Sequence, residues 1–407
     1  MANTLQPRDV YQIMNKIVSQ ATGQSNLAVV DTSSFVSVGE TLLRTAPENT
    51  LNAISTVLAD TIFSVRPYRG KLESLRVSQR RWGAQVRKLI PLYNEAEESS
   101  DWNTLLLGSF LGGSQLSHIT DGQSVDMYNI KCPKMVQLNF YGTEVLQKHI
   151  TRFRDQLALA FSSESEFVRF LDTVMTEFSN EIELLNENKS RLTLINFMLG
   201  IHDMGLTEID LVDEYNTLHS TTYTRAQLLS TYVSDFMKFV AAQIKIYSSM
   251  MTEMNTQYHA NLTGYQPILR HTPKERQKML MYNPIFIQAE SEVYSGLFNP
   301  QYLEIGDFEG VNFWQSQLTP TSIQGTPNIL DVSDGQSKNG NSAKIDYVLG
   351  LLYDEEALGV MPQFDYSSVT PFNSKGGYWN LFYHFRFNSY VDYTESAILF
   401  VLGAGGA

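Results

Sequence analysis

The sequence has 407 residues, 43% hydrophobic and 18% charged, so it is long enough for two or more cores and globular in composition. Its formal net charge of −13 disfavours nucleic acid as a general partner, because phosphate binding needs a surplus of cations. The single cysteine, Cys132, excludes internal disulfides, and no apolar run approaches the roughly 20 residues of a membrane span, so we expect a soluble protein made in a reducing cytoplasm.

The N-terminal region has the pattern of an arm. Residues 7–20 predict a short amphipathic helix with Val10, Ile13, Met14 and Ile17 on one side. Residues 47–58 predict a second helix that passes into a strand-like run ending near Tyr68. Because this region has little apolar surface to bury against itself, we expect it to lie on the rest of the chain or on a neighbouring copy.

A strongly basic stretch follows, with eight cations against one acid, Glu73. Apolar residues alternate from Leu72 to Val77 and again from Val86 to Leu89, which predicts a two-stranded hairpin, and acids at 95–101 then reverse the charge. Two interpretations stay open: a solvated hairpin balanced by these acids, or a projecting loop that docks on an acidic neighbour. The basic residues are Arg66, Arg69, Lys71, Arg76, Arg80, Arg81, Arg87 and Lys88.

The longest periodic pattern in the chain covers residues 163–199. Residues 102–130 are rich in Gly, Ser and Asp and predict loops, a strand is expected at 134–140, and a helical pattern begins after Tyr141. From 163 to 199, apolar residues recur at steps of three, four or seven; Ser163 and Glu166 have capping-box spacing, and Gly200 predicts the stop. At about 1.5 Å per residue this helix would span roughly 50 Å, so we interpret it as a strut for sheets.

Beyond this helix the chain passes from a helical pattern to a β pattern. Residues 203–220 are polar, and a second long helix is expected from the capping box of Thr224 and Gln227 to Gly264. Short strands are expected at 278–289 and 346–353. Strict alternation predicts a half-buried strand at 379–387, and continuous apolarity at 397–402 predicts a strand buried on both faces.

The sequence offers little support for catalysis. Its seven histidines are scattered without metal-ligand spacing, and no nucleotide-binding loop or nucleophile elbow is present, so we expect no enzyme activity, metal or cofactor. Asp203, Asp210, Asp213 and Glu214 could form a cation or acid–base site, but acids clustered in a polar linker are far more often a solvated face.

The C-terminal strands resemble a known family. Residues 376–384 (GGYWNLFYH), followed closely by 396–401, resemble the closing segment of major capsid proteins from small short-tailed, protein-primed tailed bacteriophages. Residues 35–43, leading to 65, are similar to that family's N-arm and entry to its extended loop. The basic hairpin falls where the family has its extended loop, 165–199 falls at its spine helix, and 224–258 resembles a helix of its axial domain.

This resemblance implies an α+β fold of the Hong Kong 97 type. It divides the chain into an N-terminal arm (1–62), an extended loop (63–101), a peripheral domain (102–204) with spine helix 163–199, an axial domain (205–375), and C-terminal strands (376–407) that return to the peripheral domain. The chain departs from the family in stopping at Ala407, without the immunoglobulin-like domain that relatives may append, and in residues 102–130, which have no counterpart.

The function implied is that of a structural major capsid protein that self-assembles into hexamers and pentamers of an icosahedral or prolate head around double-stranded DNA. The eight basic residues would then contact a neighbouring subunit. The implied partners are other copies, a portal protein, a scaffolding protein during assembly, and packaged DNA on the inner face without sequence-specific binding; no membrane is involved, and the protein moves from the host cytoplasm into the virion.

Two alternatives from other classes remain. One is a nucleic-acid-binding protein that uses the hairpin at 66–88, although only Tyr68 and Trp82 are available there to stack on bases. The other, less favoured, is an enzyme with an acidic site at 203–214, for which no second convergent polar cluster is visible.

Overall fold

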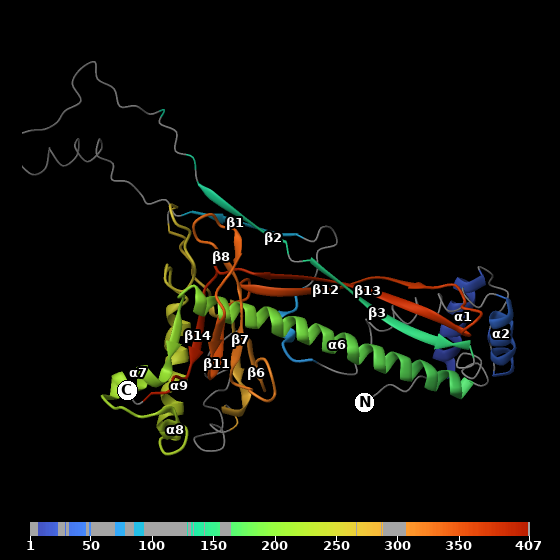
Figure 1. The fold of residues 1–407 in the computed structure, drawn as a ribbon, viewed down its shortest axis with the longest axis horizontal. Coiled ribbons are helices and arrows are strands. Elements are labelled where there is room, and N and C mark those ends of the chain that lie inside the picture. The colour runs from blue at the N-terminus through green and yellow to red at the C-terminus, as the bar shows by residue number, and fades with distance from the viewer. Residues whose placement is uncertain are drawn as a thin grey trace, which may run out of the picture.

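Two sheets and one long helix organise the chain (Figure 1). The computed structural model describes residues 7–22, 29, 32–45, 49, 70–77, 85–92, 128, 132, 134–141, 143–154, 164–265, 267–285, 287 and 307–405. The helices are α1 (Pro7–Thr22), α2 (Thr32–Thr45), α6 (Glu164–Asp203), α7 (Leu211–His219), α8 (Arg225–Leu228) and α9 (Val233–Met250), with 3-10 turns η1 (Glu73–Leu75) and η2 (Lys274–Arg276). None of these helices is long and apolar enough to cross a bilayer.

The strands form two main sheets and three small ones. A five-stranded sheet has the order β4-β14-β11-β5-β6, a three-stranded sheet has the order β12-β13-β3, and β1 pairs with β2. The small pairs are β10-β7 and β8-β9. The bounds are β1 (Gln85–Pro91), β2 (Met135–Tyr141), β3 (Thr143–Phe153), β4 (Glu208–Asp210), β5 (Gln277–Tyr282), β6 (Asp307–Val311), β7 (Ile323–Gly325), β8 (Asn328–Leu330), β9 (Ser337–Asn339), β10 (Ala343–Ile345), β11 (Val348–Asp354), β12 (Leu358–Val369), β13 (Tyr378–Val391) and β14 (Ala397–Val401).

The predicted alternation at 379–387 is confirmed by β13. Trp379, Leu381, Tyr383, Phe385 and Phe387 are buried, and the residues between them are half-buried. The 40-residue helix α6 packs on β12 and β13, so the predicted strut lies along this sheet, as Figure 1 shows. The α+β class predicted from the two periodicities is therefore confirmed.

The main core lies at the C-terminal end of α6. There β11 and β14 are buried along their whole length, which confirms the prediction for 397–402, and they pack with the C-terminal turns of α6 and with α7 and α9. The chain crosses between the two sheets three times. The helix α6 makes the first crossing, from β3 to β4, the short turn from β11 to β12 makes the second, and the segment from β13 to β14 makes the third.

The helix α6 continues past Gly200, where the sequence predicted its end. It stops in a motif centred on Gly205, at φ +63°, with Leu206 N–H donating to Ile201 O and Gly205 N–H donating to His202 O. Gly200 serves another purpose, because a Cβ there would lie 2.0 Å from the hydroxyl oxygen of Tyr393. The glycine allows the β13–β14 crossing to pack against the helix.

Three further predictions are wrong. The helical pattern expected after Tyr141 is strand β3, which pairs with β13 over its whole length. The predicted second long helix divides into α8 and α9 and ends at Met250, well before Gly264, although the capping box of Thr224 and Gln227 is present. The strand expected at 278–289 ends at Tyr282.

The pairing predicted for the basic hairpin is also wrong. β1 pairs with β2 across the intervening residues 92–134, with Leu89 opposite Gln137. Leu75 ends the 3-10 turn η1 and Leu72 immediately precedes it, and both side chains are buried in the core. The short alternation at 72–77 reflected this burial rather than a strand. The predicted strand at 134–140 is confirmed as β2.

Several predictions lie outside the described residues. These are the cap at Ser163, the side chains of Val10, Ile13 and residues 164–179, the helix and strand-like run at 47–68 apart from residue 49, and the loops at 102–130 apart from residue 128.

Candidate inter-subunit contact site

The segment 70–77 leads toward the β1–β2 ribbon and is tied to the body of the protein. Leu72 and Leu75 are buried, and the Glu309 carboxylate on β6 accepts hydrogen bonds from Leu72 N–H (2.5 Å) and Ser74 Oγ (2.8 Å). Lys278 on β5 donates to the carbonyl oxygen of Ser74 at 2.7 Å. These contacts fix the segment against the edge of the five-stranded sheet.

Arg76 ties the same segment to the spine helix. Its guanidinium lies 2.7 Å from the Glu183 carboxylate of α6, and both side chains are largely buried. Its backbone also forms an isolated parallel bridge with Val360 of β12. Arg76 therefore forms contacts inside its own subunit, at the junction of the spine helix and the three-stranded sheet.

The β1–β2 ribbon has one attached face and one free face. On the attached face, Ile90, Leu92 and Leu138 bury themselves against Ile268, forming a cluster separate from the main core. The free face carries Leu89, 55% exposed, and Met135, 57% exposed. Because Leu89 and Met135 are neighbours on adjacent strands and exposed apolar side chains that lie together mark interaction surfaces, this face is a candidate contact surface.

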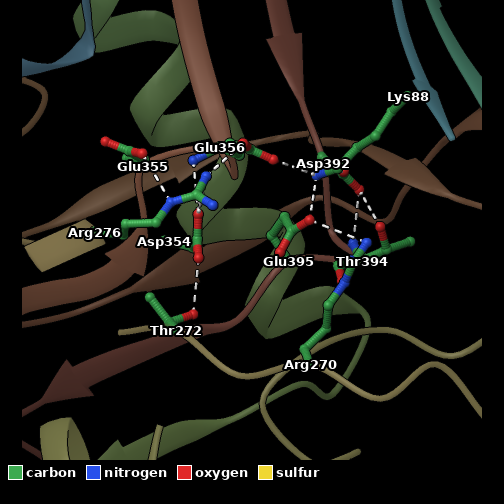
Figure 2. A network of polar contacts seen from close by, with 10 residues as sticks. All are labelled: Lys88, Arg270, Thr272, Arg276, Asp354, Glu355, Glu356, Asp392, Thr394 and Glu395. Carbon is green, nitrogen blue, oxygen red and sulfur yellow. Dashed lines mark hydrogen bonds and ion pairs between the residues drawn. The ribbon is translucent and has the colours of Figure 1, made fainter. Parts of the chain in front are cut away.

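A polar network lies at the base of the ribbon (Figure 2). Lys88 of β1 reaches into the body, where its ammonium lies 2.8 Å from the Asp392 carboxylate, 3.7 Å from Glu356, and in contact with Glu395. Burial alone would lower the pKa of Lys88, but the Asp392 and Glu395 carboxylates outweigh it and raise that pKa. The ammonium is therefore charged at neutral pH.

The body supplies the other members of this network. Arg270 lies 3.0 Å from Glu395, and its Nε donates to the carbonyl oxygen of Thr394 at 3.1 Å. Burial raises the pKa of Glu395, and the two cations only partly offset that effect. Arg276 pairs with Glu355 at 2.8 Å and with Glu356.

The acids of the network lie on two of the three crossings between the sheets. Asp354, Glu355 and Glu356 belong to the β11–β12 crossing, whereas Asp392 and Glu395 belong to the β13–β14 crossing. Backbone hydrogen bonds join the crossings directly, from Asp392 N–H to Ala357 O (2.7 Å) and from Asp354 N–H to Ser396 O (3.0 Å). One lysine on the ribbon thus contacts two of the three connections between the sheets.

The three-stranded sheet has a second face, opposite α6. On the α6 side, Lys148 and Glu144 of β3 pair with Glu181 and Lys189 of the helix. The opposite side carries two stacked pairs, His149 with Phe382 (4.7 Å between ring centroids) and Tyr366 with His384 (4.4 Å).

This second face is open in the part of the chain that the structure describes. Val145, Phe153 and Tyr366 are each about half exposed there. It therefore presents aromatic and aliphatic side chains on a long, regular surface.

The structure separates the predicted basic residues. Arg76 and Lys88 make the ion pairs described above within the chain, and Lys71 is exposed. Arg66, Arg69, Arg80 and Arg81 lie outside the described residues, as does the side chain of Arg87 on β1. An inter-subunit role for the last five and for Lys71 stays a prediction.

Three of the four acids predicted as an alternative site, Asp203, Asp210 and Glu214, have structural roles. Asp210 caps α7, accepting from Val212 N–H at 2.9 Å, and also accepts from Gly403 N–H at 2.9 Å. Glu214 accepts from the Tyr247 hydroxyl, and Asp203 accepts from the Asn341 amide at 2.9 Å. Within the described residues, no group of acids, histidines or cysteines could hold a metal ion.

The network around Lys88 was missed by the sequence analysis. Asp392 and Thr394 carry a local signal, since Asp392 Oδ1 accepts from Thr394 N–H and Oγ, an Asx-type turn between two strands. That signal predicts a turn, but the partner Lys88 is 304 residues away, and no spacing rule reaches so far.

Comparisons with known proteins show a matching family and a shared fold. The family model described as Phi29-like phage major capsid protein matches residues 108–401. A chain from the capsid structure of Staphylococcus phage Andhra is 9% identical, with 83% of this chain and 86% of that chain covered and a TM-score of 0.53. That likeness shows a shared fold.

Two further structures give weaker matches. A chain from the structure of head fiber and inner core protein gp22 of bacteriophage P68 has 9% identity, coverage of 83% and 86%, and a TM-score of 0.48. A chain from the Cyanophage P-SCSP1u capsid has 10% identity, coverage of 83% and 89%, and a TM-score of 0.42. No curated protein matches the sequence.

Proposed function

The chain belongs to the Phi29-like phage major capsid protein family and is a structural protein of the phage head, and we propose that it builds the shell as hexamers and pentamers joined through the β1–β2 ribbon. The fold is of the Hong Kong 97 type, in agreement with the expectation from the C-terminal strands. The nucleic-acid-binding and enzymatic alternatives receive no support from the family or from the described residues.

The ribbon is the observation that supports this mode of assembly. It extends from the body (Figure 1), its base is fixed by Lys88, and its free face exposes Leu89 and Met135. The open face of β12-β13-β3 is a surface of matching character on the same subunit. We propose that the ribbon of one copy lies on this face of the next, so that each contact buries both surfaces.

The proposed division of the chain follows from this arrangement. The arm at 1–62, the axial domain at 205–375 and the C-terminal strands at 376–407 keep the roles implied by the family. The pairing of β1 with β2 supports an extended loop longer than 63–101, with a peripheral domain that begins at β3 and ends with the spine helix near residue 204.

The finer partners are also proposals. A portal protein and a scaffolding protein would act during assembly, and packaged DNA would lie on the inner face without sequence-specific binding. The net charge of −13 supports this proposal, because a negatively charged shell repels negatively charged DNA and so adheres to it only weakly.

The native cysteine provides a test of the ribbon contact. Cys132 is exposed and lies three residues before β2, and Gln147 is exposed on the open face of β3. We expect a short bismaleimide to link Cys132 of one copy to a cysteine introduced by Gln147→Cys in assembled particles, giving a ladder up to six subunits on a denaturing gel.

A matched control uses the other side of the sheet. Asn188→Cys places the second thiol on an exposed position of α6, and we expect no ladder from it. Cys132→Ser should abolish the ladder of the Gln147→Cys variant. Particles that cross-link equally at positions 147 and 188, or at neither, would refute the proposed contact.

A further inference from the structure

The single lysine at the base of the ribbon joins three parts of the subunit. Its partners Asp392 and Glu395 lie on the β13–β14 crossing and Glu356 lies on the β11–β12 crossing (Figure 2), whereas Lys88 itself belongs to β1. The angle between the ribbon and the two sheets is therefore constrained at this point by one side chain.

The chain itself also attaches the ribbon to the body, because β2 ends at Tyr141 and β3 of the three-stranded sheet begins at Thr143. Apart from this link and Lys88, the contacts between the ribbon and the body are mainly apolar. The apolar attachment is the small cluster of Ile90, Leu92, Leu138 and Ile268, in which only Ile268 comes from the body, with Phe140 tilted against Tyr390 at 5.8 Å. This cluster does not join the main core. Apolar contacts have no preferred direction, so they permit sliding and rotation that an ion pair at 2.8 Å does not.

Part of the polar network in the body does not depend on Lys88. Asp392 still accepts from Thr394 N–H (2.8 Å) and Oγ (2.6 Å), and Glu395 still faces Arg270 at 3.0 Å. The two crossings also stay joined by their backbone hydrogen bonds. Loss of the ammonium therefore frees the ribbon while Asp392 Oδ1 and Glu395 keep partners in the body, although Asp392 Oδ2 loses its contact with Lys88.

We propose that Lys88 is a latch that sets the angle of the extended loop on the two-sheet body. With the ion pairs closed, the ribbon holds one orientation; with them broken, it turns about its apolar base while both sheets stay folded. In a shell, subunits in hexamers and pentamers present their loops at different angles to their neighbours, so a latch of this kind would limit which assemblies form.

Hydrogen exchange on the full-length protein tests the latch. Lys88→Met removes the charge and keeps most of the stem. We expect amide exchange in 85–92 and 135–141 to accelerate about 10- to 100-fold, as befits the loss of a charge-assisted contact, while β11 and β14 keep their protection. Glu395→Gln, which leaves Asp392 to hold the ammonium, should give a smaller acceleration in the same segments.

Lys189→Met is the matched control, because Lys189 also pairs across elements, with Glu144, and its side chain is 21% exposed against 16% for Lys88. It should leave exchange in the ribbon unchanged. Unchanged ribbon exchange in Lys88→Met would refute the latch, and so would equal acceleration in β11 and β14, which would make Lys88 a general stabiliser of the fold. Should Lys88→Met fail to fold, the latch is refuted if Glu395→Gln accelerates ribbon and core amides alike.

Discussion

Replacing Gly200 by alanine separates local helix propensity from tertiary packing. Gly200 lies inside α6, where alanine is favoured over glycine by about 1 kcal/mol on propensity alone. The Cβ would lie 2.0 Å from Tyr393 Oη and 2.4 Å from its Cζ, and Tyr393 is buried. Something must therefore move, and the tyrosine sits on the β13–β14 crossing.

The cost of that movement exceeds the gain in propensity. Overpacking a well-filled site costs about 1–3 kcal/mol. The Tyr393 hydroxyl lies between the carbonyl oxygens of Asn328 (2.9 Å) and Asn196 (3.1 Å), which share its one hydrogen, and displacing this buried group costs about 1–3 kcal/mol more. After the propensity gain is subtracted, we expect Gly200→Ala to lower the free energy of unfolding by about 1–5 kcal/mol.

Denaturant unfolding of the unassembled subunit, followed by circular dichroism, measures this effect. Tyr393→Phe should not rescue Gly200→Ala, because the ring carbons themselves lie too close. Tyr393→Leu removes the ring, and on that background Gly200→Ala should be neutral or stabilising. A neutral or stabilising effect of Gly200→Ala in the wild-type background would refute the packing argument.

Two further predictions concern a buried histidine and the basic residues outside the described part. His259 is buried and meets the carbonyl oxygen of Ile268 through Nε2 at 2.8 Å, and burial lowers its pKa. The unfolded chain then binds more protons below pH 6.5, so stability should fall as the pH drops through and below that value. Unfolding midpoints measured between pH 5 and 8 should depend less steeply on pH in His259→Gln than in the wild type. An equal pH dependence in the two proteins would contradict this prediction. Arg80→Glu with Arg81→Glu should preserve subunit melting while shells disappear or form only at raised salt, as sedimentation would show; one exposed pair is worth only about 0–1 kcal/mol, but a shell repeats it many times. Normal assembly with lost DNA affinity in filter binding would assign those arginines to nucleic acid instead.

The elements predicted correctly are those whose burial follows a simple period. The alternation at 379–387 and the apolar run at 397–402 report one-sided and two-sided burial, which the core of the protein then satisfies. The apolar repeat of α6 was equally clear, but its end was not. Gly200 looks like a stop in sequence, and only the position of Tyr393 shows that its missing side chain serves packing.

The errors arose where pairing between distant residues decides the structure. β3 has no strict alternation of apolar and polar residues, because Glu144 and Lys148 face α6 and form ion pairs with it. Its sequence therefore resembles a helical pattern. Leu72 and Leu75 resemble a strand pattern because both enter the core, one just before the 3-10 turn and one at its end.

The candidate contact site was predictable in part. The excess of cations between Arg66 and Lys88 drew attention to this region, but charge alone does not distinguish a cation that could contact another subunit from one that pairs inside its own subunit. Lys88 and Arg76 are distinguished only by carboxylates from distant segments, Asp392 and Glu183.

Electron microscopy of the full-length protein, expressed alone and together with a scaffolding protein, tests the central claim most directly. A major capsid protein of this family should appear as closed shells, or as hexamers and pentamers that sediment well ahead of a 46.1 kDa subunit. A compact monomer that persists at high concentration under both conditions would contradict the account.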